Sequence, residues 1–466
     1  MTSGPTHAIP ASTITVLAGA TLLASLGVSI ATIALPTLAR SFPVSIAELQ
    51  WVILAYLLAM TVTIVSAGRL GDLYGHRRVL LAGLLLFTLA SALCAISPNL
   101  ALLVAARALQ GVGGAILVAL PMSIARETVP EQKLGSVMGL LGTMSAAGTA
   151  LGPSLGGVVM ANLGWQAAFA LLAAGSGAVL ALGPSALPAH ERNIGHAAGM
   201  DWRGTLLLTT TLGLFALATT GAGIPLPLGG GLLLLPAVLT LALFARMQVN
   251  TPSPLIPLSL IRNRTIGAGL LMNLLLGTVM MTTLVVGPFF LSFGLGLDET
   301  MTGLVMAVGP VVAVVAGTPA GRLADRVGNG RARLLGLAET VLGFVCLATL
   351  PHWFGAAGYV AALVVLTPGF QLFLAANNAA VMMAAPPTER GVLSGLLGLS
   401  RNLGLLVGAS AMATLFIALV GTKAIAQAAI PSIASAFSAS FLIAAFLTAL
   451  GIVLSAFDRR PVAPGI

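Results

Sequence analysis

Long apolar runs constrain the fold of this chain more than any other feature of its sequence. A helix of about 20 residues spans the hydrocarbon layer of a bilayer, and lipid cannot satisfy exposed backbone polar groups. Each apolar run of about that length is therefore expected to form one spanning helix. Fourteen such runs lie near residues 13–36, 49–67, 79–97, 99–125, 134–161, 166–187, 204–223, 228–246, 266–293, 301–320, 334–350, 356–385, 391–420 and 433–457.

Composition excludes a soluble protein. Hydrophobic residues make up 58% of the chain and charged residues 7%, and the mean hydropathy is +1.05. In soluble domains about a quarter of the residues are charged, so this chain has too little polar surface to cover a globule in water. Both cysteines, Cys94 and Cys346, lie inside apolar runs and are expected to be packing residues. We expect no metal site and no cofactor.

The basic residues predict the orientation in the membrane. The net charge of +9 would suggest a nucleic-acid partner in a soluble protein, but here the basic residues fall in short loops, so no nucleic-acid partner is expected. Of the 21 lysines and arginines, only Arg40 and Lys423 fall in loops on one side, and Arg107 and Arg401 fall within runs. The other side is expected to be cytoplasmic, with both termini there. The sequence lacks a basic region before the first run, so no cleavable signal peptide is expected.

Two copies of one charged loop indicate two related halves. Residues 68–78 read GRLGDLYGHRR, and residues 321–333 read GRLADRVGNGRAR. Each copy has a carboxylate at its fifth position, a glycine that permits a tight turn, and arginines before the next apolar run. This pattern resembles the cytoplasmic loop motif of major facilitator superfamily transporters, although Leu73 and His76 replace basic residues that the family often has. The resemblance implies gating roles for Asp72, Gly75, Arg77, Arg78 and Asp325.

The resemblance implies an all-α integral membrane protein of the plasma (inner) membrane with the major facilitator fold. We expect a six-helix bundle over residues 1–190, two accessory spans with their connectors over 191–264, and a second six-helix bundle over 265–466. The connectors Asp201-Trp202-Arg203-Gly204 and PLIPLSLIRNRT (254–265) resemble those of the fourteen-span drug:proton antiporter family. The alternative is an amphipathic linker with an accidental pair of apolar runs.

A glycine-rich string in the fifth run favours export. Residues 148–157, GTALGPSLGG, match the motif Gly-x-x-x-Gly-Pro-x-x-Gly-Gly that is associated with exporters of this superfamily. Small residues four apart let helices approach closely, and proline bends a helix, so Gly148, Gly152 and Pro153 are candidate gate residues. Gly152-x-Ser154-x-Gly156 also fits a hydrolase pattern, but no strand precedes it and no histidine lies in an apolar core. An enzyme is therefore not expected.

Polar residues within the runs are candidates for the substrate cavity. Residues 107–114, RALQGVGG, resemble the superfamily motif Arg-x-x-Gln-Gly-x-Gly. An arginine within the membrane usually faces a cavity or a partner, although Arg107 could instead snorkel from the end of its span. We expect Arg107, Gln110, Asn273, Asn377 and Arg401 to line a cavity that favours neutral or anionic compounds. Alternatively, the amides link helices by hydrogen bonds.

One acidic residue is a candidate for proton coupling. Residues 26–36, LGVSIATIALP, resemble a segment of the fourteen-span family, but Gly27 stands where that family has an aspartate implicated in recognising cations or protons. Of the 12 acidic residues, only Glu339 lies within a run, about 9 Å deeper than Arg333 along a helix. Burial favours the neutral form of a carboxyl, which makes Glu339 a candidate proton carrier. The alternative is a partly hydrated glutamate paired with an arginine of the preceding loop.

These features together predict a secondary active transporter. We expect a monomer in contact with membrane lipid that exports a small, amphipathic compound by alternating access, in exchange for protons. The alternatives are an uncoupled or metabolite-specific facilitator and a lipid-handling flippase of the same fold.

Overall fold

The described part of the chain is built from helices and short connections. A computed structural model of the protein describes residues 11–42, 44–129, 131–188, 201–220, 230–251, 258–384, 390–422 and 425–457, and no strand occurs in these ranges. Ten of the described helices are long and apolar enough to cross a membrane. The chain therefore has the all-helical, multi-span architecture that its apolar runs predict.

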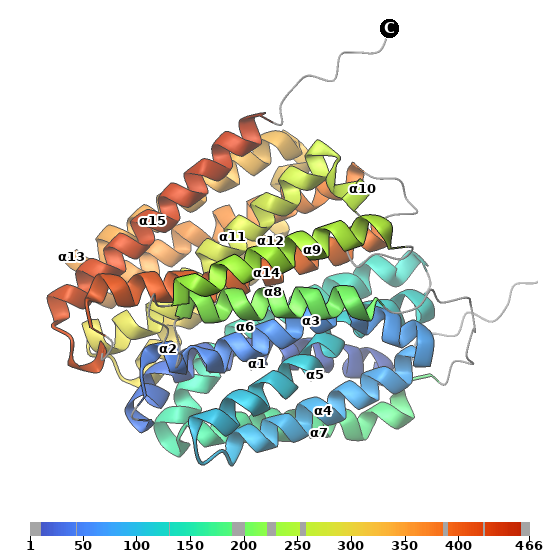
Figure 1. Cartoon of the computed structure of the whole chain (residues 1–466), viewed down its shortest axis with the longest axis horizontal. Coiled ribbons are helices and arrows are strands. Elements are labelled where there is room, and N and C mark those ends of the chain that lie inside the picture. The colour runs from blue at the N-terminus through green and yellow to red at the C-terminus, as the bar shows by residue number, and fades with distance from the viewer. Residues whose placement is uncertain are drawn as a thin grey trace, which may run out of the picture.

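The helices fall into two large sets with a pair between them (Figure 1). The amino-terminal set comprises α1 (Ala11–Ser41), the short α2 (Ile46–Leu49), α3 (Trp51–Tyr74), α4 (His76–Ala95), α5 (Leu100–Thr128), α6 (Glu131–Leu163) and α7 (Trp165–Ala186). The pair comprises α8 (Trp202–Thr220) and α9 (Leu234–Asn250), which follows the 3-10 turn η1 (Gly230–Leu233). The carboxy-terminal set comprises the short α10 (Leu258–Ile261), α11 (Arg264–Phe289), the π-helical turn η2 (Phe290–Gly294), α12 (Glu299–Val327), α13 (Asn329–Met383), α14 (Arg390–Val420), the 3-10 turn η4 (Ile425–Gln427) and α15 (Ile430–Phe457).

The long element α13 consists of two helices joined at Gly355. Its backbone there has φ 54° and ψ −132°, values that are not helical and that favour glycine. Gly343 packs against Leu366 and Gly336 against Phe373, so the two helices run antiparallel. The sequence predicts the same division, between runs 334–350 and 356–385.

The two copies of the charged loop form the same kind of turn. Gly75 between α3 and α4 has φ 92°, and Gly328 between α12 and α13 has φ 83°. An L side chain rarely adopts this conformation, which explains the glycine in each copy. The predicted tight turns are therefore confirmed at both positions.

The long helices run between two ends of the molecule, and Arg40 lies at one end and Gly75 at the other. The Arg40 end is the end at which α1 terminates and α12 begins, and the Gly75 end is the end at which α3 turns into α4. Because successive long helices alternate in direction, α6 also terminates at the Arg40 end and α15 begins there (Figure 1).

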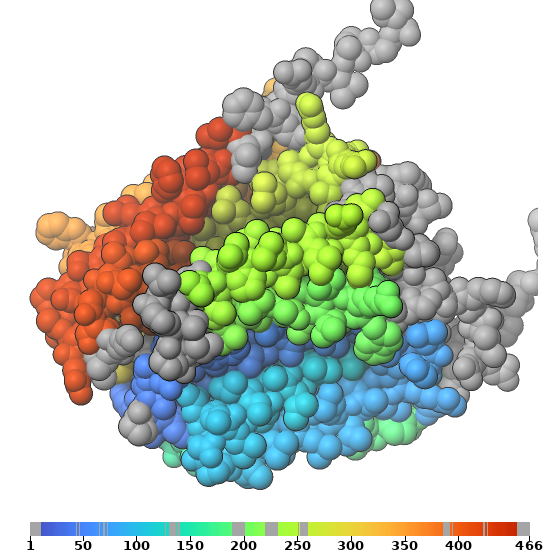
Figure 2. Space-filling model, viewed as in Figure 1, coloured from blue at the N-terminus to red at the C-terminus, as the bar shows by residue number. Residues whose placement is uncertain are grey.

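The pair α8 and α9 occupies the surface between the two halves on the face shown in Figure 2. Helix α8 packs against α3 of the amino-terminal half and against α14 of the carboxy-terminal half. Near its end, Thr219 forms a hydroxyl–hydroxyl hydrogen bond with Ser410, and Thr414 donates a hydrogen bond of 2.9 Å to the Thr219 carbonyl oxygen. The described hydrogen bonds between α8 and the bundle helices thus go to α14.

Small residues allow close helix packing in both halves. On α6, a Cβ at Gly148 would collide with the Leu22 carbonyl oxygen of α1, and a Cβ at Gly152 would collide with the Ser29 hydroxyl of α1. On α14, a Cβ at Gly404 would likewise collide with the backbone of α11. The contact of α6 with α1 agrees with the packing role that the sequence predicts for its glycines, whereas the second contact was not predicted.

Candidate functional site

Arg107 joins three helices inside the amino-terminal half. Its side chain on α5 is fully buried. The Nε atom donates a hydrogen bond of 2.9 Å to the Val52 carbonyl oxygen of α3, and Nη1 donates one of 3.0 Å to the Gly27 carbonyl oxygen of α1. The guanidinium also lies over the Tyr56 ring, with Cζ 4.3 Å from the ring centroid. Arg107 therefore has partners in the bundle interior, and the alternative of snorkelling to the end of its span is wrong.

Gln110 is held in one orientation next to Arg107. The Ser91 hydroxyl donates a hydrogen bond of 2.6 Å to the Phe87 carbonyl oxygen, which leaves its oxygen free to accept. Gln110 Nε2 donates to that oxygen at 2.7 Å, and Gln110 Oε1 accepts a hydrogen bond from Arg107 Nη1. This chain of donors extends the Arg107 network to α4.

The described hydrogen bonds of Arg107 include no carboxylate. Its Nη2 atom is buried and has no hydrogen-bond partner among the described residues. At Gly27, where the resembling family has an aspartate, an added Cβ would lie 3.1 Å from Phe87 Cζ and 3.5 Å from Tyr56 Oη. Aromatic side chains thus occupy the space beside Gly27, and the guanidinium is stabilised by carbonyl dipoles and an aromatic face.

The amides of the carboxy-terminal half link helices. Asn273 Nδ2 donates hydrogen bonds of 2.9 Å to the Leu397 carbonyl oxygen and 3.0 Å to the Ser400 hydroxyl, which joins α11 to α14. Asn377 Nδ2 donates a hydrogen bond of 3.0 Å to the Gly269 carbonyl oxygen, which joins α13 to α11. Both side chains are buried. The alternative of interhelical hydrogen bonds is therefore observed for both amides, and their predicted contact with substrate remains a prediction.

Arg401 and Glu339 differ in their surroundings from Arg107. Arg401 lies on α14 with an accessible side chain that is nevertheless surrounded by protein, and no hydrogen bond or ion pair is described for it within the described ranges. Glu339 lies in the first helix of α13 and is half-buried. Its side chain packs closely on Gly369 of the second helix of α13. Neither residue contacts the Arg107 network through a described hydrogen bond.

The glycine-rich segment of α6 also touches the other half of the molecule. A Cβ at Gly157 would lie 2.5 Å from the Glu299 carbonyl oxygen and 3.1 Å from Gly303 Cα, both on α12. A Cβ at Gly303 would lie 3.1 Å from the Pro153 carbonyl carbon and closer still to the Pro153 oxygen. We call the contact of Pro153 and Gly157 with Gly303 the α6–α12 seam. It closes the two halves against each other toward the Arg40 end, and Gly303 was not a predicted site residue.

The predicted gate loop is described in part. The side chain of Asp72 lies outside the described residues. Arg77 Nη2 donates a hydrogen bond of 2.6 Å to the Pro184 carbonyl oxygen, which joins the start of α4 to the end of α7. Arg78 and Asp325 are exposed, and their gating roles remain predictions.

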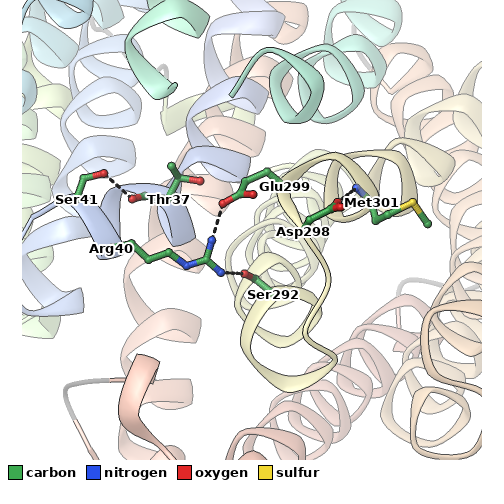
Figure 3. A network of polar contacts seen from close by, with 7 residues as sticks. All are labelled: Thr37, Arg40, Ser41, Ser292, Asp298, Glu299 and Met301. Carbon is green, nitrogen blue, oxygen red and sulfur yellow. Dashed lines mark hydrogen bonds and ion pairs between the residues drawn. The ribbon is translucent and has the colours of Figure 1, made fainter. Parts of the chain in front are cut away.

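A polar network at the Arg40 end joins the two halves (Figure 3). Arg40 Nη1 at the end of α1 lies 2.5 Å from Glu299 Oε1 at the start of α12. Arg40 Nη2 donates a hydrogen bond of 2.7 Å to the Ser292 hydroxyl of η2. The sequence predicts that Arg40 and Glu299 both lie outside the apolar runs, but it does not pair them. Their opposite charges in loops on one side were the available signal.

Comparison with known proteins agrees with this architecture. The Major Facilitator Superfamily matches residues 17–409, so the chain belongs to this family of transporters. It is 29% identical over 443 residues to the riboflavin transporter RibZ of Clostridioides difficile (strain 630), covering 94% of this chain and 95% of that protein. It is 29% identical over 423 residues to the multidrug efflux pump LfrA of Mycolicibacterium smegmatis (strain ATCC 700084 / mc(2)155), covering 90% of this chain and 82% of that protein.

A solved structure shares the fold. A bacterial homolog of the human lysosomal transporter Spinster superposes with a TM-score of 0.70 at 14% identity, covering 97% of this chain and 99% of that one. The chain is therefore a multi-pass membrane transporter with the all-helical major facilitator fold, and this family is one of transporters rather than enzymes.

Proposed function

We propose that this transporter exports a small, amphipathic compound from the cytoplasm by alternating access, in exchange for protons, through fourteen spans in the plasma (inner) membrane. Both termini are then cytoplasmic, the Gly75 end faces the cytoplasm and the Arg40 end faces outward. The bundles 1–190 and 265–466 move against each other, with the spans of 191–264 between them.

The α6–α12 seam is the observation that carries this proposal. Gly148 and Gly152 pack α6 on α1, while Pro153 and Gly157 of the same helix pack on Gly303 of α12. One helix thus connects the interior of one half with the surface of the other. A contact built from glycine and backbone can close tightly and separate without rearranging long side chains, as alternating access requires. The segment also carries the motif that resembles exporters, and the relative LfrA is a multidrug efflux pump.

The charges of the described site support neutral or anionic substrates. Arg107 is buried without a carboxylate among its described hydrogen bonds, and Arg401 is exposed on α14. A buried or partly dehydrated positive charge disfavours a permanent cation nearby. Robust export of a dication by the parent protein would contradict this assignment.

Reconstitution into liposomes tests the transport reaction. Liposomes with an acidic lumen should accumulate a substrate from a labelled panel that includes riboflavin and neutral or anionic polycyclic aromatic compounds. Accumulation should collapse when a protonophore removes the pH gradient, since outward proton flow drives it. Liposomes without protein are the control, and a panel without any protein-dependent uptake would contradict the proposal.

A second candidate is an uncoupled, metabolite-specific facilitator. It is favoured by the described hydrogen bonds of Arg107, which include no carboxylate, and by the position of Glu339, which packs on Gly369 within α13. The relative RibZ is a riboflavin transporter. In this case one compound would enter the liposomes only until its concentrations inside and outside were equal. The protonophore would leave the rate of uptake unchanged.

A further inference from the structure

The network at the Arg40 end connects three elements through one arginine. From the last turn of α1, Arg40 reaches Glu299 on α12 and Ser292 on η2 (Figure 3). Its guanidinium carbon also lies 5.1 Å from the centroid of the Phe293 ring on η2. The partners of Arg40 named here all belong to the carboxy-terminal half, so each contact crosses between the halves.

The network lies directly beside the α6–α12 seam. The backbone oxygen of Glu299 faces Gly157 of α6, while its side chain faces Arg40 of α1. Glu299 therefore contacts two helices of the amino-terminal half at once. Separating α12 from α6 at this end moves Glu299 away from α1 as well, so the ion pair cannot survive that separation.

The strength of this network suits a contact that breaks and re-forms. The side chains of Arg40 and Glu299 are 43% and 27% exposed, so solvent screens their attraction. The additional hydrogen bond to Ser292 and the ring contact of Phe293 fix the geometry of the guanidinium. Water can hydrate both charges once the end opens, so no buried unpaired charge results.

We propose that Arg40, Ser292 and Glu299 form a latch that stabilises the state closed at the Arg40 end and must break in each transport cycle. This Arg40 latch rests on the proposed alternating access. Because it contributes to one of the two states only, weakening it shifts the equilibrium toward the state open at the Arg40 end.

Distance measurements between spin labels test the latch without a known substrate. The parent protein has Cys94 and Cys346 replaced by alanine. One label pair at exposed positions, Leu163→Cys with Ile430→Cys, reports on the Arg40 end. A second pair, Tyr74→Cys with Met383→Cys, reports on the Gly75 end. Both are measured on full-length protein in lipid nanodiscs.

The latch variants are Arg40→Gln and Glu299→Gln, each combined with both label pairs. Each should raise the ratio of open to closed protein at the Arg40 end by about 1.5-fold to fivefold and shift the Gly75 end in the opposite sense. The charge exchange Arg40→Glu with Glu299→Arg should restore part of the closed population. High salt should reduce the difference between the parent and the single variants.

Asp298→Asn is the matched control. Asp298 precedes Glu299, and its Oδ1 accepts a hydrogen bond of 2.7 Å from the Met301 backbone nitrogen at the start of α12. Asparagine keeps this cap, and Asp298→Asn removes one negative charge as Glu299→Gln does. Asp298, however, has no described contact with Arg40. Its distance distributions should match those of the parent.

The distance distributions distinguish a failure of alternating access from a failure of the Arg40 latch. If the parent shows a single distance population at both ends under all conditions, including both pH extremes, alternating access is not supported and the latch falls with it. If the parent shows two populations but Arg40→Gln and Glu299→Gln shift them no more than Asp298→Asn does, alternating access stands and the latch is overturned.

Discussion

Replacing Gly303 with alanine should open the α6–α12 seam. The added Cβ would lie 3.1 Å from both Gly157 Cα and the Pro153 carbonyl carbon, and it would collide with the Pro153 oxygen. Carbon atoms pack favourably at about 3.5–4.0 Å, and the Pro153 oxygen is nearer to the added Cβ than either carbon atom, so α12 must retreat from α6 by about 1 Å. The obstructing atoms are backbone atoms, which cannot rotate away.

The expected size of this effect follows from overpacking. Inserting a methyl group into a close-packed contact costs about 1–3 kcal/mol. Under the proposed alternating access, the state closed at the Arg40 end bears this cost and the open state does not, so the ratio of open to closed protein should rise roughly 5- to 150-fold. The label pair at Leu163 and Ile430 measures that ratio directly, and thermal unfolding shows whether the variant remains folded.

Gly309→Ala on the same helix is the control for this prediction. A Cβ at Gly309 would lie 3.8 Å from its nearest neighbours on Leu363 and Thr367, which is ordinary van der Waals contact. This variant has the same composition and the same gain in helix propensity. If Gly303→Ala and Gly309→Ala give equal distance distributions, the seam does not set the closed state and the packing argument is refuted.

Three further predictions concern other residues. Asp72→Asn should impair transport of a panel substrate while membrane insertion stays normal, and Asp325→Asn should have a smaller effect; transport at the parent rate in Asp72→Asn would contradict the gate assignment. Gln110→Leu removes the side-chain acceptor of Arg107 Nη1 and the amide that donates to the Ser91 oxygen. The free energy of unfolding should therefore fall by about 1–3 kcal/mol. An unchanged melting temperature would show that the network adds nothing to stability. Glu339→Gln should abolish accumulation driven by a pH gradient but leave counterflow exchange intact, and persistent proton-driven accumulation would exclude Glu339 as the proton carrier.

Features that repeat along the chain could be predicted from the sequence. Apolar runs of helical length predict the helices because lipid imposes the same requirement on each of them. The division of α13 at Gly355 and the turns at Gly75 and Gly328 follow from local chemistry, since only glycine readily adopts positive φ. These predictions need no knowledge of which helices are neighbours.

Contacts between distant residues could not be predicted in the same way. Arg107 is satisfied by the backbone carbonyls of Gly27 and Val52, and every residue carries such a carbonyl, so no pattern in the sequence marks these two. Arg40 and Glu299 are separated by 259 positions, and only the packing of α12 beside α1 brings them together. Arginine within a span predicts that a partner exists but does not identify it.

The attachment of α8 makes the two halves of this transporter unequal. The Thr219 hydroxyl shares a hydrogen bond with the Ser410 hydroxyl, and the Thr219 carbonyl oxygen accepts one from the Thr414 hydroxyl; these bonds hold α8 on α14, and α8 also packs against α3. If the bundles move against each other as proposed, these hydrogen bonds should carry α8 and α9 with the carboxy-terminal half, and α3 should slide along α8. On this face α8 and α9 cover the boundary between the two halves, so during such a movement they would keep acyl chains away from it. The exposed apolar side chains of α9 would then face the lipid, and the bilayer would rearrange around a larger moving body on one half than on the other.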